Sequence, residues 1–163
     1  MSTIKRNLIA VPAIAILTAQ CVTMENGFNL HPASDGVIRL HNDQGGLIRA
    51  YRDRFIRAHE NGERVVIDGM CISACTLAIG LLPPGRVCVT PQAVLGFQSA
   101  WTPPLLTIGK ISEADRIPNP KATQYMMNIY PPVLQQWINQ HGGLTPKVIY
   151  LRGKELTAIV PKC

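Results

Sequence analysis

The sequence has few of the features that would mark a cofactor, a metal ion or a nucleic acid as its ligand. It contains no glycine-rich phosphate loop, and its cysteines and histidines do not fall at the spacing of a metal site. Aromatic residues make up only 6% of the 163 positions, and they form no base-stacking platform with the 16 basic residues. We therefore expect no cofactor, no metal and no nucleic-acid partner.

The sequence also lacks an apolar run long enough to span a membrane. Residues 8–17 are the strongest candidate, but this run is much shorter than the roughly 20 residues of a spanning helix. Lys5 and Arg6 precede the run and Ala19 follows it, which is typical of an export signal. We predict a signal peptide over residues 1–19, an N-terminal segment over residues 20–36, and a periplasmic or secreted protein. Cys21 leaves open a lipid anchor, and hence membrane association through the N-terminus, although Gln20 fits that signal poorly.

Charged residues are scarce as well, which indicates a packed domain. They make up 16% of the chain against 47% hydrophobic residues, a balance that argues against disorder and favours one globular domain. The net charge of +6 includes five arginines from Arg49 to Arg64. These fall mostly opposite the apolar side of a predicted helix, so we interpret them as a solvated face.

Alternating strand and helix patterns predict an α/β domain over residues 37–163. Strand patterns occur at residues 37–40, 65–68, 86–89 and 93–97, and helical spacing occurs at residues 47–61 and 73–81. The resulting order, β-α-β-α-β-β, favours parallel strands with functional groups at their ends.

The second half of the chain is less regular. Residues 101–120 predict a long loop that either covers the face holding Ser73 or forms an exposed connection. Residues 121–141 predict two helices that are interrupted at Pro131-Pro132, and residues 148–151 predict a further strand.

Four cysteines are candidates for disulfides: Cys71, Cys75, Cys88 and Cys163. An exported protein meets an oxidising compartment, in which they would form one or two bonds. We expect Cys88 to pair with Cys71 or Cys75, because residues 86–89 should lie beside the strand that ends at Gly69. A metal site is the weaker alternative, since no histidine is close to Cys71 or Cys75 in the sequence.

Ser73 follows a short apolar strand that breaks at Gly69, and helical spacing begins directly after it. This position predicts an exposed hydroxyl at a strand-to-helix turn, which suits a nucleophile. The next backbone N–H, that of Ala74, would be free to stabilise an oxyanion. A serine there is also well suited to cap the helix, and on spacing alone the capping role is the more common one.

Two motifs at successive strand ends resemble the Clp protease proteolytic-subunit family of the crotonase-like superfamily. They are NDQGG at residues 42–46 and CISAC at residues 71–75. Exported bacterial members carry motifs similar to LGFQ at residues 95–98, YPP at 130–132 and GGLTP at 142–146. The resemblance implies a single-domain, crotonase/Clp-protease-like spiral of β-β-α units. It also implies that Ser73 is the nucleophile and that the N–H groups of Gly46 and Ala74 form the oxyanion hole.

The triad is where the sequence departs from this family. The position of the family's histidine base falls on Gln98, and an amide is not basic near neutral pH. The position of the acid falls near Pro146-Lys147-Val148, where there is no Asp or Glu. Other histidines that could act as a relocated base are His31, His41, His59 and His141.

Three functions remain open from the sequence. The first is a serine peptidase-related protein of the bacterial envelope that keeps its nucleophile and oxyanion hole but is catalytically impaired. The second is a non-catalytic module that binds a peptide, an acyl group or a protein partner. The third is an active serine hydrolase with a relocated base. The resemblance further allows an oligomer, because Clp-like subunits form rings.

Overall fold

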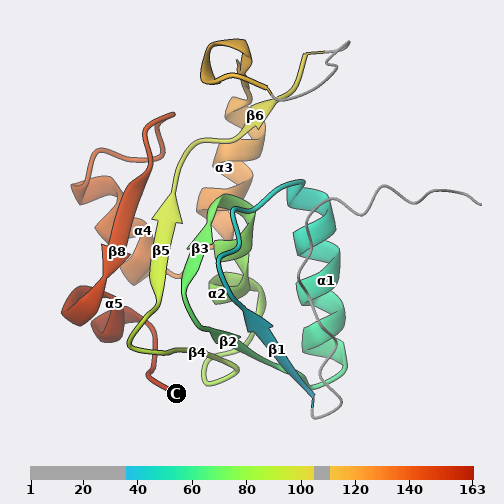
Figure 1. The fold of residues 1–163 in the computed structure, drawn as a ribbon, viewed down its shortest axis with the longest axis vertical. Coiled ribbons are helices and arrows are strands. Elements are labelled where there is room, and N and C mark those ends of the chain that lie inside the picture. Colours follow the sequence, from blue (N-terminus) through green and yellow to red (C-terminus); the bar gives the residue numbers. More distant parts are fainter. Residues whose placement is uncertain (1–35, 105–110) are drawn as a thin grey trace, which may run out of the picture.

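The computed structural model describes residues 36–104 and 111–163, which form a mixed α/β domain with five α-helices and three small sheets (Figure 1). The predicted signal peptide, Cys21 and His31 lie outside the described residues. Among the helices that are described, none combines the length and the apolar character needed to cross a bilayer.

The first sheet is parallel and contains β1 (Val37–Leu40), β2 (Arg64–Ile67) and β4 (Val87–Val89) in the order β1-β2-β4. The helix α1 (Ile48–Glu60) connects β1 to β2, as parallel pairing requires. Its buried side chains are Tyr51, Phe55 and Ala58, which recur at helical spacing. The predicted strands and helix are confirmed here to within one or two residues.

The second sheet contains β3 (Met70–Ile72), β5 (Val94–Phe97) and β8 (Ile149–Arg152). Strand β3 is parallel to β5, and β8 is antiparallel to it. Strand β3 was not predicted from the sequence, because Gly69 is also typical of the end of a strand. The chain instead bends at Gly69, whose φ of 124° is accessible to glycine, and continues from the first sheet into the second.

Four further helices follow along the chain: α2 (Ala78–Leu81), α3 (Pro120–Ile129), α4 (Pro132–Gln140) and α5 (Gly153–Ile159). Of these, α5 packs against β5 and β8. The predicted interruption between two helices is confirmed, with α4 beginning at Pro132. Helix α5 was not predicted. Helices α2 and α3 approach so closely that a Cβ on Gly80 would overlap the carbonyl oxygen of Ile129.

The segment predicted as a long loop has some regular structure. Its described part contains the antiparallel pair β6 (Trp101–Thr102) and β7 (Ile117–Pro118) and a 3₁₀ turn at Glu113–Asp115. The backbone N–H of Asn119 donates to the carbonyl of Ala100, so the two ends of the segment meet before α3 begins. Residues 105–110 lie outside the described part.

Two disulfides join the four candidate cysteines, as Cys71–Cys75 and Cys88–Cys163. The prediction that these cysteines form disulfides is confirmed, but the expected pairing of Cys88 with Cys71 or Cys75 is wrong. Cys88 lies in the first sheet beside Val66, whereas Cys71 lies in the second sheet beside Leu95. The C-terminal tail follows β4 instead, and the Cys163 N–H donates to Val89 O at 3.1 Å.

Candidate active site

Ser73 follows β3 directly and adopts a strained backbone conformation. Its φ is 57°, in the left-handed region that residues other than glycine rarely enter. The 3₁₀ turn Ser73–Leu77 begins at the serine, and the capping position belongs to Ile72, with no side-chain capping bond. The capping role considered from the sequence is therefore not what Ser73 does. Strain of this kind costs about 1–3 kcal/mol and is typical of functional positions.

The Gly-Gly loop packs directly against this turn. A Cβ on Gly45, whose φ is 77°, would overlap Ile72 O and would lie 3.0 Å from both Ser73 Cβ and Ala74 N. Asp43 holds the loop in place, because its Oδ1 accepts from Gly45 N at 2.8 Å and from Tyr51 Oη at 2.5 Å. Burial, reinforced by the Asp43 carboxylate, raises the pKa of Tyr51, so its hydroxyl stays protonated as the donor.

The same loop is joined to β3 by backbone hydrogen bonds. Asp43 N donates to Met70 O at 2.7 Å, and Ile72 N donates to Asp43 O at 2.9 Å. Neither Gly46 N nor Ala74 N has a hydrogen-bond acceptor within residues 36–104 and 111–163. These are the two amides that the family resemblance assigns to an oxyanion hole. Gly46 lines the same cleft as Ser73, whereas Ala74 is fully buried directly behind the serine.

Two buried hydroxyls support the carbonyl of Ser73 from inside the core. Thr76 Oγ1 donates to Ser73 O at 2.7 Å, so the Tyr130 hydroxyl, also 2.7 Å away, must donate to Thr76 Oγ1. Burial raises the pKa of Tyr130 and keeps that proton in place. The end of α3 is thereby connected to the candidate nucleophile through two hydrogen bonds.

Gln98 follows β5 and lines the same cleft as Ser73. The volume of this cleft is about 900 Å³. We call this the Ser73 cleft, and its lining also includes Gly45, Gly46 and Tyr51. The Gln98 residue is only 9% exposed, and its amide has no hydrogen-bond partner among the described residues. The position where the resemblance expects an acid is occupied by Pro146, Lys147 and Val148, which line an adjoining pocket.

None of the described histidines lines the Ser73 cleft. His41 contacts the backbone carbonyl of Asp68, and His59 lies in the last turn of α1. The ring of His141 stacks on Trp137 with a centroid separation of 4.1 Å, and its Nδ1 is 2.8 Å from Trp137 O. The structure therefore brings Ser73, Gly46 and Gln98 to one cleft without any of these three histidines.

The comparisons with known proteins include a distant match to a solved structure. No protein-family model matches the chain, and no curated protein matches it. A solved structure of a mutant ClpP1 from Listeria monocytogenes is similar over 77% of this chain and 71% of its own, at 15% sequence identity. The TM-score of that match is 0.41. At these values the match assigns neither a family nor an activity to the chain.

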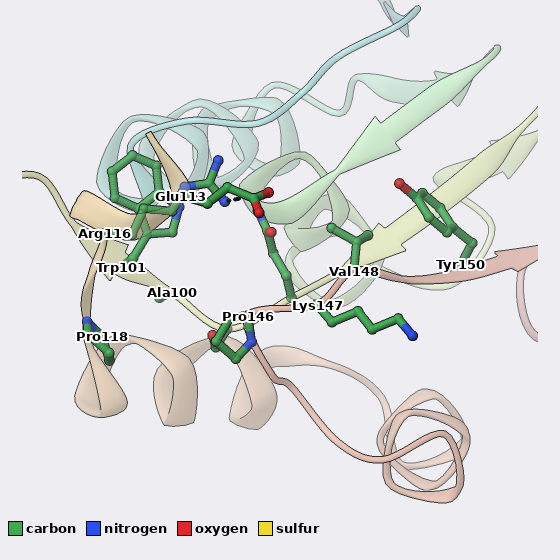
Figure 2. Close-up of a pocket in the computed structure, with 11 residues that line it drawn as sticks. Ala100, Trp101, Glu113, Arg116, Pro118, Pro146, Lys147, Val148 and Tyr150 are labelled. Carbon is green, nitrogen blue, oxygen red and sulfur yellow. Dashed lines mark ion pairs between the residues drawn. The ribbon is translucent and has the colours of Figure 1, made fainter. Parts of the chain in front are cut away.

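Sequence reasoning missed the side chains that the irregular segment adds to the site. Trp101, Glu113 and Arg116 line the Ser73 cleft, together with Tyr150 from β8. Figure 2 shows Trp101, Glu113 and Arg116 gathered at one end of the adjoining pocket. The only sequence feature that pointed to these residues was a tryptophan, Trp101, shortly after Gln98. No local pattern indicated that Arg116 would contact Trp101 in the fold.

We expect the two hydrogen bonds that link Tyr130, Thr76 and the Ser73 carbonyl to contribute measurably to the free energy of unfolding. Tyr130→Phe should cost about 1 kcal/mol, whereas Thr76→Val should cost about 1–3 kcal/mol because it leaves the Tyr130 hydroxyl and Ser73 O without their partner. Urea unfolding of both variants and the double variant would measure the coupling. Because burial raises the pKa of Tyr130, the difference between wild type and Tyr130→Phe should shrink above about pH 10, where the unfolded tyrosine ionises. Additive costs in the double variant would contradict this account.

Proposed function

We propose that this protein is a Clp-protease-like, serine peptidase-related protein of the bacterial envelope that holds a peptide or acyl group without rapid turnover. In this proposal the domain is a crotonase-type spiral of β-β-α units, Ser73 keeps the position of the nucleophile, and the amides of Gly46 and Ala74 keep the oxyanion hole. Gln98 stands at the position of the base and cannot accept a proton.

One observation carries the proposal: Ser73 is held at a φ of 57° in the same cleft as Gln98, a largely buried residue whose amide remains accessible to the cleft. Backbone strain is retained where the surrounding structure or a function requires it, and an accessible amide on a largely buried residue can hydrogen-bond to a ligand in the cleft. Both features favour a ligand-binding cleft built on a hydrolase-like turn.

The loss of the base has a large expected effect on rate. Without it, only the oxyanion hole and substrate binding contribute, a loss on the order of 10⁴ to 10⁶ relative to a complete triad. The two disulfides are compatible with an oxidising, exported location, which the proposed envelope function needs. A non-catalytic role as a binding module on the same cleft is the second candidate, favoured by the unpartnered Gln98 amide.

A fluorophosphonate probe tests the proposal. Wild-type protein should label at Ser73 barely above the background of Ser73→Ala, because no base activates the hydroxyl. Gln98→His should raise labelling above wild type, and Gln98→His combined with Ser73→Ala should remove the gain. The gain should be partial, since a histidine without an orienting acid can lose about 10⁴ in rate. Ser112→Ala, which lies outside the cleft, is the matched serine control.

The opposite result would be rapid labelling of the wild type at Ser73, with hydrolysis of an ester substrate. The impaired-enzyme proposal would then be wrong, and the protein would be an active hydrolase with a relocated base.

A further inference from the structure

A second pocket of about 470 Å³ adjoins the Ser73 cleft. Gln98, Trp101 and Arg116 line both cavities, so a ligand that contacts these side chains from the cleft lies next to the second pocket. We call this second cavity the Arg116 pocket. Pro146 and Lys147, from the connection between α4 and β8, line this pocket but not the Ser73 cleft.

Arg116 is arranged as an incompletely paired cation. Its guanidinium carbon lies 5.0 Å from the centroid of the Trp101 ring, which is a cation–π contact. Its buried Nε has no hydrogen-bond partner among the described residues. Its nearest carboxylate is that of Glu113, 3.8 Å from Nη1, on a side chain that is 90% exposed. An exposed pair at that distance contributes little, so the forked guanidinium is available to a stronger acceptor.

Gln98 supplies the second polar group. The residue is 9% exposed and lines both cavities, and its amide has no partner among the residues that the structure describes. The amide atoms are not themselves buried, so a ligand in either cavity can reach them and replace solvent. Its NH₂ group can donate to a carboxylate oxygen, and its carbonyl can accept from a peptide N–H.

The charges around the pocket favour an anion. Glu113 is the only acidic side chain among the described residues that line either cavity, whereas Arg116 and Lys147 are basic. Figure 2 shows Arg116 and Glu113 facing each other and Lys147 extending away from them. The planar guanidinium of Arg116 can form two parallel hydrogen bonds to a carboxylate, and the Gln98 amide can donate a third. A lysine ammonium, which is a point charge, does not match the two carboxylate oxygens in this way.

We propose that Arg116, supported by Trp101 and Gln98, binds the carboxylate of a peptide ligand whose chain occupies the Ser73 cleft. This inference rests on the proposed function, since it assigns the ligand of the same cleft. The carboxylate belongs either to a free C-terminus or to an acidic side chain. In the free protein the exposed Glu113 carboxylate lies beside the Arg116 guanidinium. The carboxylate of the ligand replaces it there on binding.

Four short peptides and the two tryptophans of the chain provide a test. The peptides are acetyl-tetraalanine with a free carboxyl end, its C-terminal amide, and two further amides that carry glutamate or glutamine at the third position. Binding to the mature protein is followed by the ¹⁵N-indole resonance of Trp101, which a Trp101→Phe variant identifies. The variants are Arg116→Gln, Arg116→Lys and Gln98→Leu. Arg57→Gln removes the same charge from an exposed site outside both cavities and is the matched control.

At least one carboxylate peptide should bind wild type about 10- to 100-fold more tightly than its neutral counterpart. Arg116→Gln should abolish that preference, Arg116→Lys should restore part of it, and Arg57→Gln should leave it unchanged. Gln98→Leu should weaken the same peptide. Preference for the free C-terminus or for the glutamate side chain identifies the source of the carboxylate.

Equal binding of charged and neutral peptides, or an equal effect of Arg116→Gln and Arg57→Gln, would overturn the carboxylate subsite while leaving a peptide-binding cleft in place. Failure of all four peptides to bind would overturn both the subsite and the peptide-holding part of the proposed function. The fluorophosphonate result is separate from both outcomes, because it reports on Ser73 alone. Unchanged thermal unfolding of each variant would show that a lost preference reflects the site and not the fold.

Discussion

Replacing Cys88 and Cys163 together with alanine should lower the free energy of unfolding by about 4.5 kcal/mol. The bond closes a loop with a sequence separation of 75, which restricts the unfolded chain strongly. It also ties the C-terminal tail to β4, where Val89 N donates to Pro161 O at 2.9 Å. A loss of this size approaches the total stability of many small domains, about 5–15 kcal/mol. Urea unfolding under non-reducing conditions would measure it.

The second disulfide is a control within the same chain. Cys71 and Cys75 are separated by only four positions, so the same chain-entropy relation gives about 2 kcal/mol for their removal. We therefore expect the Cys71→Ala/Cys75→Ala protein to be clearly more stable than the Cys88→Ala/Cys163→Ala protein. The reverse order would show that the short ring stabilises the native turn itself and that loop length does not govern these bonds.

Gly45→Ala should cost about 2–6 kcal/mol and should disturb the turn at Ser73. A side chain at a φ of 77° is strained by about 1–3 kcal/mol, and the added Cβ would overlap the backbone oxygen of Ile72. Relief requires movement of the backbone, because the overlapping atom belongs to β3, and overpacking of this kind adds roughly 1–3 kcal/mol. Thermal and urea unfolding would measure the loss, and near-ultraviolet circular dichroism would report the altered packing of Tyr51.

Gly46→Ala is the matched variant for stability. Its Cβ would lie 3.5 Å from the Tyr51 ring, an ordinary van der Waals contact, and Gly46 has no positive φ. Its cost should stay below about 1 kcal/mol. Equal losses for the two variants would mean that the loop is loosely held and that Gly45 does not fix the position of Ser73.

Local patterns predicted the elements that depend on local chemistry. Helix α1 was predictable because Tyr51, Phe55 and Ala58 recur on one face, and the break between α3 and α4 was predictable from Pro131-Pro132. The bend at Gly69 was not, since a glycine that ends a strand and a glycine that bends one between two sheets look alike in the sequence. The pairing of Cys88 followed from that error, because the division into two sheets separates it from Cys71.

The residues of the candidate site also fall into two groups, those that local sequence patterns predicted and those that only the fold brings together. Ser73, Gly46 and Gln98 lie at strand ends or in turns beside them, so motif spacing located them before the fold was known. Trp101 and Arg116 meet only because the β6–β7 pair brings together residues far apart in the chain. That register depends on Ala100, Asn119 and the packing of α3, none of which has a periodic signature.

The Cys71–Cys75 bond has a consequence for biogenesis. Ser73 is the middle residue of the short ring that this bond closes, so the turn acquires its final covalent form only after oxidation. A chain retained among cellular reductants would carry two thiols beside an untethered turn, whereas a chain that reaches an oxidising compartment would be matured there by thiol oxidation. In the proposed exported protein, assembly of the candidate site would therefore be coupled to transport of the chain, and the redox catalysts of the destination compartment would take part in its maturation.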